Sequence, residues 1–209
     1  MEPSRWRRWP QVFNRWRYNL YAPVYDRLAQ AFAARRRRSI ALLNPQPEER
    51  ILLVAAGTGL DLDFMVRCRH LVAIDISDGM LARLRAHAAT LGMEVDARVM
   101  DAQALEFADA SFDAVVLHLA LAVVPDPRAC IREVERVLKP GGRVAVFDKF
   151  LHDDQRPSLL RSAGNLLSRV IATDINRRLA DILAGCRLRK VHDEDAGLGG
   201  FFRIAILRK

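Results

Sequence analysis

From residue 48 onward, short apolar runs alternate with segments whose apolar residues recur every three to four positions. Such runs are typical of strands buried on both faces of a sheet, and the longer spacing is typical of amphipathic helices. Strands are predicted near residues 51–55, 71–75, 95–99, 113–118, 143–148, 186–191 and 201–208. Helices are predicted over 61–69, 78–91 and 127–138, followed by a mostly helical stretch over 157–184. This order predicts an α/β fold with a doubly wound, mostly parallel seven-stranded sheet.

Local signals support two of these boundaries. Asp126 and Pro127 suit the N-cap and first turn of helix 127–138, and Pro140-Gly141-Gly142 is expected to end it. The last two strands are expected to form a hairpin through residues 197–200 that closes the sheet.

A glycine-bracketed turn follows the first strand. Gly57-Thr58-Gly59 brings bare backbone close to a ligand, and Asp75, at the end of the second strand, can accept both hydroxyls of a ribose. There is no third glycine in the G-x-G-x-x-G spacing and no Lys-Ser/Thr after the turn, which disfavours a phosphate ligand. The arrangement predicts a site for an adenosine derivative, although the glycine pair alone is equally consistent with an ordinary tight turn.

The charge is concentrated in residues 1–44, which we predict to be an arm separate from the main domain, residues 45–209. The arm holds ten arginines against Glu2 and Asp26, which accounts for the whole formal charge of +8. It also holds every tryptophan and tyrosine of the chain: Trp6, Trp9, Trp16, Tyr18, Tyr21 and Tyr25.

The arm has the pattern of a basic amphipathic helix, because Trp9, Phe13, Trp16 and Leu20 recur at helical spacing. Tryptophan favours the bilayer interface, and each arginine near an anionic surface adds about 1 kcal/mol. We expect contact with an anionic membrane surface through Trp6, Trp9, Trp16 and the arginines, with residues 35–38 as a second basic patch. Nucleic-acid binding, which the helical spacing disfavours, and a helix that only covers the core remain alternatives.

Other features of the sequence indicate where the protein is located and which kinds of site it lacks. No apolar run reaches the roughly 18 residues of a membrane span, and the amino terminus is charged where a secretory signal is apolar, so we expect a cytoplasmic protein, peripheral on the inner face of the membrane. Cys68, Cys130 and Cys186 are expected to be reduced thiols. No metal site is expected, because residues 152–154 and 192–195 are polar runs typical of solvated loops.

An ordered series of motifs resembles the class I S-adenosylmethionine-dependent methyltransferases, which have a Rossmann-like fold. The series covers residues 18–150 and consists of Tyr21-Ala22-Pro23-Val24-Tyr25-Asp26, Gly57-Thr58-Gly59, Asp75-Ile76-Ser77 with Met80-Leu81, Asp101-Ala102-Gln103, Phe112-Asp113-Ala114-Val115 and Leu138-Lys139-Pro140-Gly141-Gly142-Arg143. Within that class, Val123-Val124-Pro125-Asp126-Pro127 and Asp148-Lys149-Phe150 are most similar to bacterial phospholipid N-methyltransferases related to ubiquinone/menaquinone C-methyltransferases.

The resemblance implies a cofactor, S-adenosyl-L-methionine, and roles for individual residues. Gly57 and Gly59 would pass under its methionine part, Asp75 would bind the ribose, and Asp101 with Ala102 would hold the adenine edge. His118 would face the methyl group. The residues implied as cofactor-binding are Tyr25, Gly57, Thr58, Gly59, Asp61, Asp75, Ile76, Met80, Asp101, Ala102 and His118.

The chain departs from the family pattern at two positions. Members usually carry an acid at the position of Leu53, where it holds the ammonium group of the cofactor, and a glycine at that of Ala55. Asp61 or Asp63 could replace the acid, because a buried ammonium without a partner is costly.

The expected reaction is methylation of the amine of phosphatidylethanolamine and of its methylated intermediates at the membrane surface, with the arm as a lid over the active site. Tyr25 and His118 are the candidate catalytic residues that position the amine or accept its proton. Lys149 or the arginines could attract the lipid phosphate. The alternatives are C-methylation of a prenylated quinone precursor and a non-catalytic binding protein with a degenerate cofactor site.

Overall fold

The computed structural model describes residues 32–150, 177–197 and 200–209. The strands are β1 (Arg50–Val54), β2 (His70–Asp75), β3 (Val95–Val99), β4 (Phe112–His118), β5 (Leu138–Lys149), β6 (Arg189–Asp195) and β7 (Phe202–Arg208). The helices are α2 (Ala33–Leu43), α3 (Asp78–Thr90), α4 (Pro127–Val137) and α6 (Leu179–Leu183), with a 3-10 turn η2 (Leu62–Phe64). None of the helices in these ranges is long and apolar enough to cross a bilayer.

The strands form one seven-stranded sheet in the order β3-β2-β1-β4-β5-β7-β6. Strands β1 to β5 are parallel to one another, whereas β7 runs antiparallel between β5 and β6. The strand order reverses between β1 and β4, as in doubly wound sheets. The predicted fold class is confirmed.

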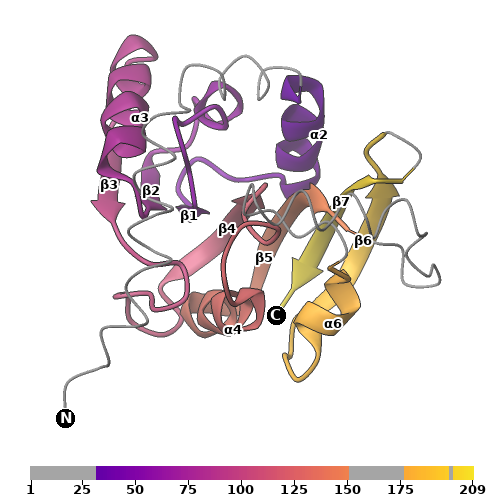
Figure 1. Cartoon of the computed structure of the whole chain (residues 1–209). Helices are drawn as coiled ribbons and strands as arrows, with labels where there is room; N and C mark the ends of the chain where they lie inside the picture. Colours follow the sequence, from indigo (N-terminus) through magenta and orange to yellow (C-terminus); the bar gives the residue numbers. More distant parts are fainter. Residues whose placement is uncertain (1–31, 151–176, 198–199) are drawn as a thin grey trace.

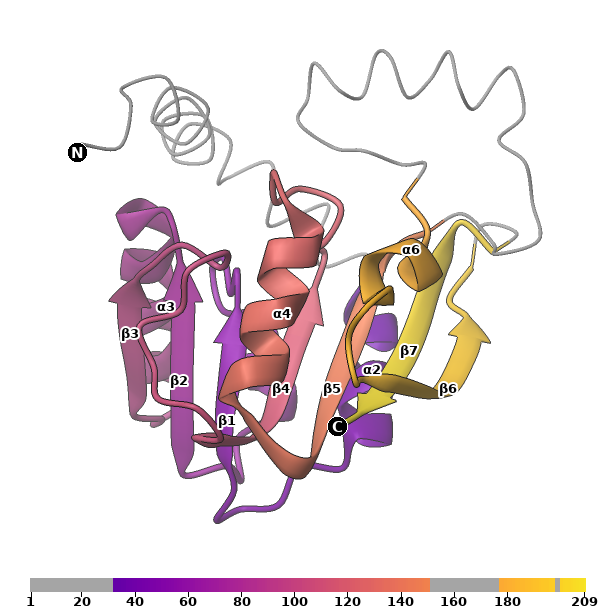
Figure 2. The ribbon, with the colours of Figure 1, turned by 90° about the horizontal axis from the view of Figure 1, so that it is seen from below.

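Helices cover both faces of the sheet (Figures 1 and 2). Ile51 and Leu53 of β1 pack with α2 and α3, whereas Leu52 and Val54 pack with α4 and α6. Successive side chains of a strand point to opposite faces, so a strand covered on both sides must be apolar throughout. The continuous apolar runs of the sequence are explained by this packing.

Helix α2 belongs to the packed domain although the boundary predicted at residue 44 assigns it to the arm. Its N-terminal neighbour Phe32 lies with its ring centroid 4.7 Å from that of Phe202 and 5.7 Å from that of Phe147. Ile40 and Leu43 are buried against the sheet. The rest of the predicted arm, residues 1–31, lies outside the described residues.

The four arginines expected to form a second basic patch, residues 35–38, do not all face solvent. Consecutive residues of a helix point about 100° apart, so the four arginines face different neighbours. Arg36 is 5% exposed, Arg35 donates to the carbonyl of Ala196, and Arg38 donates to both carboxylate oxygens of Glu194 at 2.9 and 3.0 Å. These arginines therefore bind α2 to the rest of the domain.

The helix predicted over 61–69 is wrong except for η2. The apolar residues of this segment that become buried, Leu62, Met65 and Cys68, are spaced by three positions. Backbone bonds follow the same spacing, because Met65 N–H donates to Leu62 and Cys68 N–H donates to Met65. A period of three suits 3-10 turns better than an α-helix, which has 3.6 residues per turn.

The strand predicted near 186–191 begins three residues later. Arg187 is bound to Glu135 of α4 through its backbone N–H at 3.0 Å and through Nε at 2.8 Å, so pairing with β7 starts only at Arg189. The polar run 192–195, expected to be a loop, is the second half of β6. A strand at the edge of a sheet tolerates charged residues, which also protect it from further pairing. The predicted hairpin between the last two strands is confirmed.

Ala55, one of the two family departures, follows β1 with a φ of 52°. A left-handed backbone costs a residue with a Cβ about 1–2 kcal/mol, and glycine escapes this cost. We predict that Ala55→Gly raises the free energy of unfolding by about 1 kcal/mol, after allowance for the greater freedom of glycine in the unfolded chain. Denaturant titration measures the change.

Ala56→Gly is the matched control. Ala56 is not among the residues with positive φ. This substitution should lower the free energy of unfolding by about 0.5–1 kcal/mol. Equal effects of the two substitutions would contradict backbone strain at Ala55.

Candidate cofactor site

The predicted site residues come from four separate stretches and meet at one edge of the sheet. Gly57 and Gly59 follow β1, Asp75 ends β2, Asp101 follows β3, and His118 ends β4. Since these strands are parallel, their carboxyl ends lie side by side. The edge includes the place where the strand order reverses, which is where doubly wound sheets bind their ligands.

Asp75 points toward the glycine turn. Its carboxylate oxygens accept hydrogen bonds from the backbone N–H of Gly57 and of Ser77, both at 2.9 Å. Burial raises the pKa of Asp75, and the N–H groups of Ser77, Gly57 and Ile76 oppose that shift. A carboxylate can accept about four hydrogen bonds, so these donors leave capacity for a ribose hydroxyl. The acid fixes the turn and fits the sugar of an adenosyl ligand.

The turn requires glycine at two positions. Gly57 has a φ of 56° and Gly59 a φ of 84°, which side chains rarely adopt. A Cβ on Gly59 would also lie 2.9 Å from Cγ of Leu84 and 3.1 Å from Cδ1 of Leu62. Thr58, between the glycines, is buried. The backbone at Gly59 is held close to the core by α3 and η2, and only glycine fits there.

Gln103 orders the segment that is expected to border the adenine. Asp101 Oδ1 accepts hydrogen bonds from the backbone N–H and the side-chain amide of Gln103, both at 2.9 Å. The side-chain oxygen of Gln103 in turn accepts from the backbone N–H of Asp126 at 2.8 Å. Ala102, between Asp101 and Gln103, is buried. The segment after β3 is thereby tied to the start of α4.

Two further predicted residues, Ile76 and Met80, lie directly after β2 and in the first turn of α3, respectively. Met80 is buried, and its backbone N–H donates to the hydroxyl of Ser77, which is the N-cap of the helix. Ile76 is half-buried next to Asp75. Both residues support the turn that holds Asp75.

A buried charge network lies at the same edge, on the α2 side. Asp61 Oδ2 lies 2.9 Å from Nη1 of Arg36, and Asp61 Oδ1 lies 2.7 Å from Nδ1 of His118. His118 Nε2 lies 2.9 Å from the hydroxyl oxygen of Ser39. The side chains of Arg36 and Asp61 are 6% exposed and that of His118 is 1% exposed. The network joins α2, the loop after the glycine turn and the end of β4.

Electrostatics favour a charged Asp61 inside this network. Burial alone would raise the pKa of Asp61, but the Arg36 guanidinium and the His118 ring outweigh burial and hold that pKa far below its usual range. A charge so deeply buried is tolerated only with close partners. The carboxylate is therefore an ionised anchor between α2 and the cofactor loop.

Asp61 and His118, the two residues expected to contact the cofactor from the α2 side, already have protein partners. Each carboxylate oxygen of Asp61 already faces a protein partner, and both ring nitrogens of His118 do as well. The edge of the His118 ring also packs against Phe147, with centroids 5.8 Å apart. That Asp61 contacts the ammonium group of the cofactor, and His118 its methyl group, remains a prediction.

The other expected residues are placed as follows. Asp63 lies on the exposed side, where Oδ1 is 2.9 Å from Nε2 of His87 in α3. Leu53 is 1% exposed in the core between the sheet and the α2 layer, so β1 supplies no acid. Tyr25 lies outside the described residues. Within the described ranges, no group of three His, Cys, Asp or Glu side chains could hold a metal ion.

Arg36 and Ser39 were missed as functional residues. They share one face of α2 with Ile40 and Leu43, all buried. An arginine and a serine on an otherwise apolar helical face are the signal that could have identified them, because a charge on such a face needs a buried partner.

The comparisons with known proteins identify the family and the fold. Residues 52–146 match the methyltransferase domain family. The chain is 32% identical to a phosphatidylethanolamine N-methyltransferase of Cereibacter sphaeroides over 80% of the chain and 83% of the relative. It is 38% identical to a demethylmenaquinone methyltransferase of Thermus thermophilus over 61% of each chain. For a ubiquinone/menaquinone biosynthesis C-methyltransferase of Roseobacter denitrificans, 37% identity covers 51% of the chain and 44% of the relative.

Solved structures share the fold. The cyclase SpnF superposes with a TM-score of 0.72 at 20% identity, covering 86% of this chain and 82% of the other. A putative sarcosine dimethylglycine methyltransferase from Galdieria sulphuraria superposes with a TM-score of 0.69 at 16% identity, covering 86% of each chain. Identities this low establish the fold alone.

Because the 32% match extends over most of both chains, the chain belongs to the class I S-adenosylmethionine-dependent methyltransferases. Its cofactor is S-adenosyl-L-methionine, which fits the glycine turn and the carboxylate of Asp75.

Arg36→Met tests the buried network. Removing one partner of a buried ion pair typically costs about 3–5 kcal/mol, so we expect a loss of this size in the free energy of unfolding at neutral pH. The stabilisation from a lowered pKa is present above the ordinary carboxyl pKa and is lost as the pH falls below it. The free energy of unfolding of Arg36→Met should therefore fall less than that of the wild type as the pH is lowered.

Arg37→Met is the control for that experiment. Arg37 is exposed on the same helix, with its guanidinium carbon 5.4 Å from the ring centroid of Phe64. Its removal should cost less than about 1 kcal/mol. A comparable loss from both variants in denaturant titrations would show that helix α2 tolerates no substitution and that the charge pair has no special weight.

The raised pKa of Asp75 predicts a pH dependence of cofactor binding. The ribose hydroxyls need an ionised acceptor, so affinity should be full above that pKa and fall as the pH drops through it, at a higher pH than an ordinary carboxyl would give. Calorimetry with S-adenosylhomocysteine at a series of pH values measures this. Asp75→Asn should bind more weakly at neutral pH and lose most of the dependence; an unchanged affinity would remove Asp75 from the site.

Proposed function

We propose that the chain methylates the amine of phosphatidylethanolamine, and of its methylated intermediates, at a membrane surface. The observation that carries this proposal is the 32% identity to a phosphatidylethanolamine N-methyltransferase over 80% of the chain and 83% of the relative. The match to the demethylmenaquinone methyltransferase covers only 61% of each chain. The match to the phosphatidylethanolamine N-methyltransferase extends beyond residues 52–146, the part that matches the methyltransferase domain family. Since the residues that contact the acceptor lie outside the shared cofactor fold, a match of this extent favours the same methyl acceptor in both proteins.

The basic aromatic arm supports a membrane setting. Its tryptophans, Trp6, Trp9 and Trp16, and its arginines suit the interface of an anionic bilayer. We propose that the arm holds the enzyme on the inner face of the membrane and covers the active site when lipid is bound. The methyltransferase domain then needs to bind only the headgroup of the lipid.

Methyl transfer is an in-line displacement, for which the cofactor supplies a reactive methyl sulfonium. The chain aligns the two reactants and excludes water. Asp75 and the glycine turn would hold the adenosyl part, and Asp101 with Ala102 would border the adenine. The acceptor amine is largely protonated at neutral pH, and Tyr25 is the candidate that accepts its proton. His118 would act through Asp61, by keeping the loop after the glycine turn in place.

A transfer assay tests the acceptor. Purified chain is given methyl-labelled cofactor and anionic vesicles that contain both phosphatidylethanolamine and a demethylated quinone. We expect label in the methylated phospholipids, and little when residues 1–20 are deleted. Label in the quinone alone would establish C-methylation instead, and absence of label from both lipids would refute a lipid acceptor. Asp75→Asn, with a weakened cofactor site, is the inactive control.

A further inference from the structure

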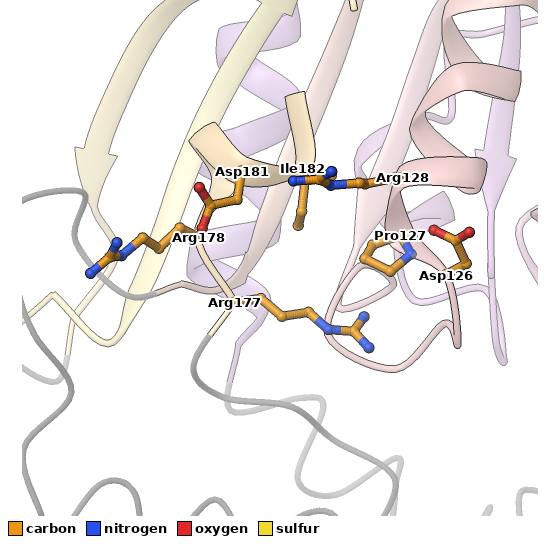
Figure 3. A pocket seen from close by; sticks show the side chains of 7 residues that line it. All are labelled: Asp126, Pro127, Arg128, Arg177, Arg178, Asp181 and Ile182. Atoms are coloured by element: carbon orange, nitrogen blue, oxygen red, sulfur yellow. The ribbon is translucent and has the colours of Figure 1, made fainter. Parts of the chain in front are cut away.

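A pocket of ≈ 270 Å³ lies between the first turn of α4 and helix α6 (Figure 3). It is lined by Asp126, Pro127, Arg128, Arg177, Arg178, Asp181 and Ile182. Three of these side chains are guanidinium groups, and they come from two separate parts of the chain. None of them belongs to the cofactor site described above.

The pocket adjoins the loop after β4, at the edge of the sheet that carries the candidate cofactor site. Arg177 Nη1 donates to the carbonyls of Leu121 and Val124, the latter at 2.8 Å. Ala122, in the same loop, donates its backbone N–H to the buried carboxylate of Asp148 at 2.9 Å. The loop after β4 is thus bound by Arg177 on one side and by the end of β5 on the other. A ligand in the pocket would lie beside the ends of both strands.

The charges of the pocket suit a phosphodiester. Figure 3 shows the guanidinium of Arg128 beside Ile182, whereas the guanidinium of Arg177 points past Pro127 and that of Arg178 points away from both. Asp126 Oδ1 accepts from the backbone N–H of Ala129 at 2.9 Å, so that carboxylate caps α4. The planar fork of a guanidinium matches phosphate oxygens. The apolar walls, Pro127 and Ile182, suit the methylene groups that flank such a phosphate.

We infer that this pocket binds the phosphodiester of the ethanolamine phospholipid whose amine is methylated, with Arg128 as its ligand and Arg177 as the anchor of the neighbouring loop. The inference rests on the proposed function. Asp126 and Asp181 also line the pocket, and their carboxylates repel a dianion such as free phosphate more than a monoanionic diester that carries its own ammonium group. The pocket therefore selects a zwitterionic headgroup over inorganic phosphate.

The first test is kinetic. Arg128→Gln in the full chain is assayed with a short-chain phosphatidylethanolamine below its micelle concentration, which removes membrane binding from the measurement. Loss of a charge-assisted bond to phosphate should raise KM for the lipid about tenfold. Both kcat and KM for the cofactor should be unchanged, because Arg128 touches neither the cofactor site nor the reacting amine.

Arg132→Gln is the matched control. Arg132 is an exposed arginine about one turn further along α4 and does not line this pocket. It should leave KM for the lipid unchanged. Equal values of KM in wild type and Arg128→Gln, or an equal rise in both variants, would overturn the inference.

Binding without catalysis separates this inference from the proposed function. Calorimetry should show that glycerophosphoethanolamine binds the wild type and binds Arg128→Gln about tenfold more weakly. Inorganic phosphate that binds as tightly as glycerophosphoethanolamine would overturn the headgroup assignment. If the wild type methylates no phospholipid but binds glycerophosphoethanolamine through Arg128, the pocket stands and the proposed function fails. If it methylates phospholipid and Arg128→Gln behaves as wild type, the function stands and the pocket fails.

Discussion

The buried pair of Arg36 and Asp61 is the interaction on which the cofactor edge depends. Asp61 follows the glycine turn by two residues, and its carboxylate is held between a guanidinium from α2 and the His118 ring at the end of β4. A buried carboxylate is stable only with such partners, so the three elements must be in place together. The position of the glycine turn is therefore coupled to the packing of α2, the helix in the C-terminal part of the predicted arm.

The fold was predictable because its signals are local. Strands covered on both faces are apolar throughout, and α3 and α4 begin at N-caps, Ser77 and Asp126, whose side chains accept from the first turn. Prediction failed where long-range contacts decide the backbone. The segment after the glycine turn became 3-10 turns because its buried residues are spaced by three, and β6 began late because Arg187 is bound to Glu135 of a distant helix. The contact of Arg187 with Glu135 cannot be read from neighbouring residues.

The site was predicted in part for the same reason. Parallel strands bring their carboxyl ends together, so Gly57, Asp75 and Asp101 could be placed at one edge from sequence order. The bond from Gly57 to Asp75 confirms that the acid faces the turn. The partners of Asp61 could not be predicted, because Arg36 lies 25 positions away and is one of four consecutive arginines. Only the rotation of α2 decides which of those arginines is buried.

The placement of β7 constrains the order of assembly of the sheet. Strand β6 precedes β7 in the chain, yet among the described strands it pairs only with β7, which also covers the outer edge of β5. During synthesis β6 must therefore wait without a partner while the edge of β5 stays open, and unpaired edges invite aggregation. The charged residues of β6 keep the waiting strand soluble. The polar composition of this strand, which concealed it in the sequence, is thus an advantage for a nascent chain.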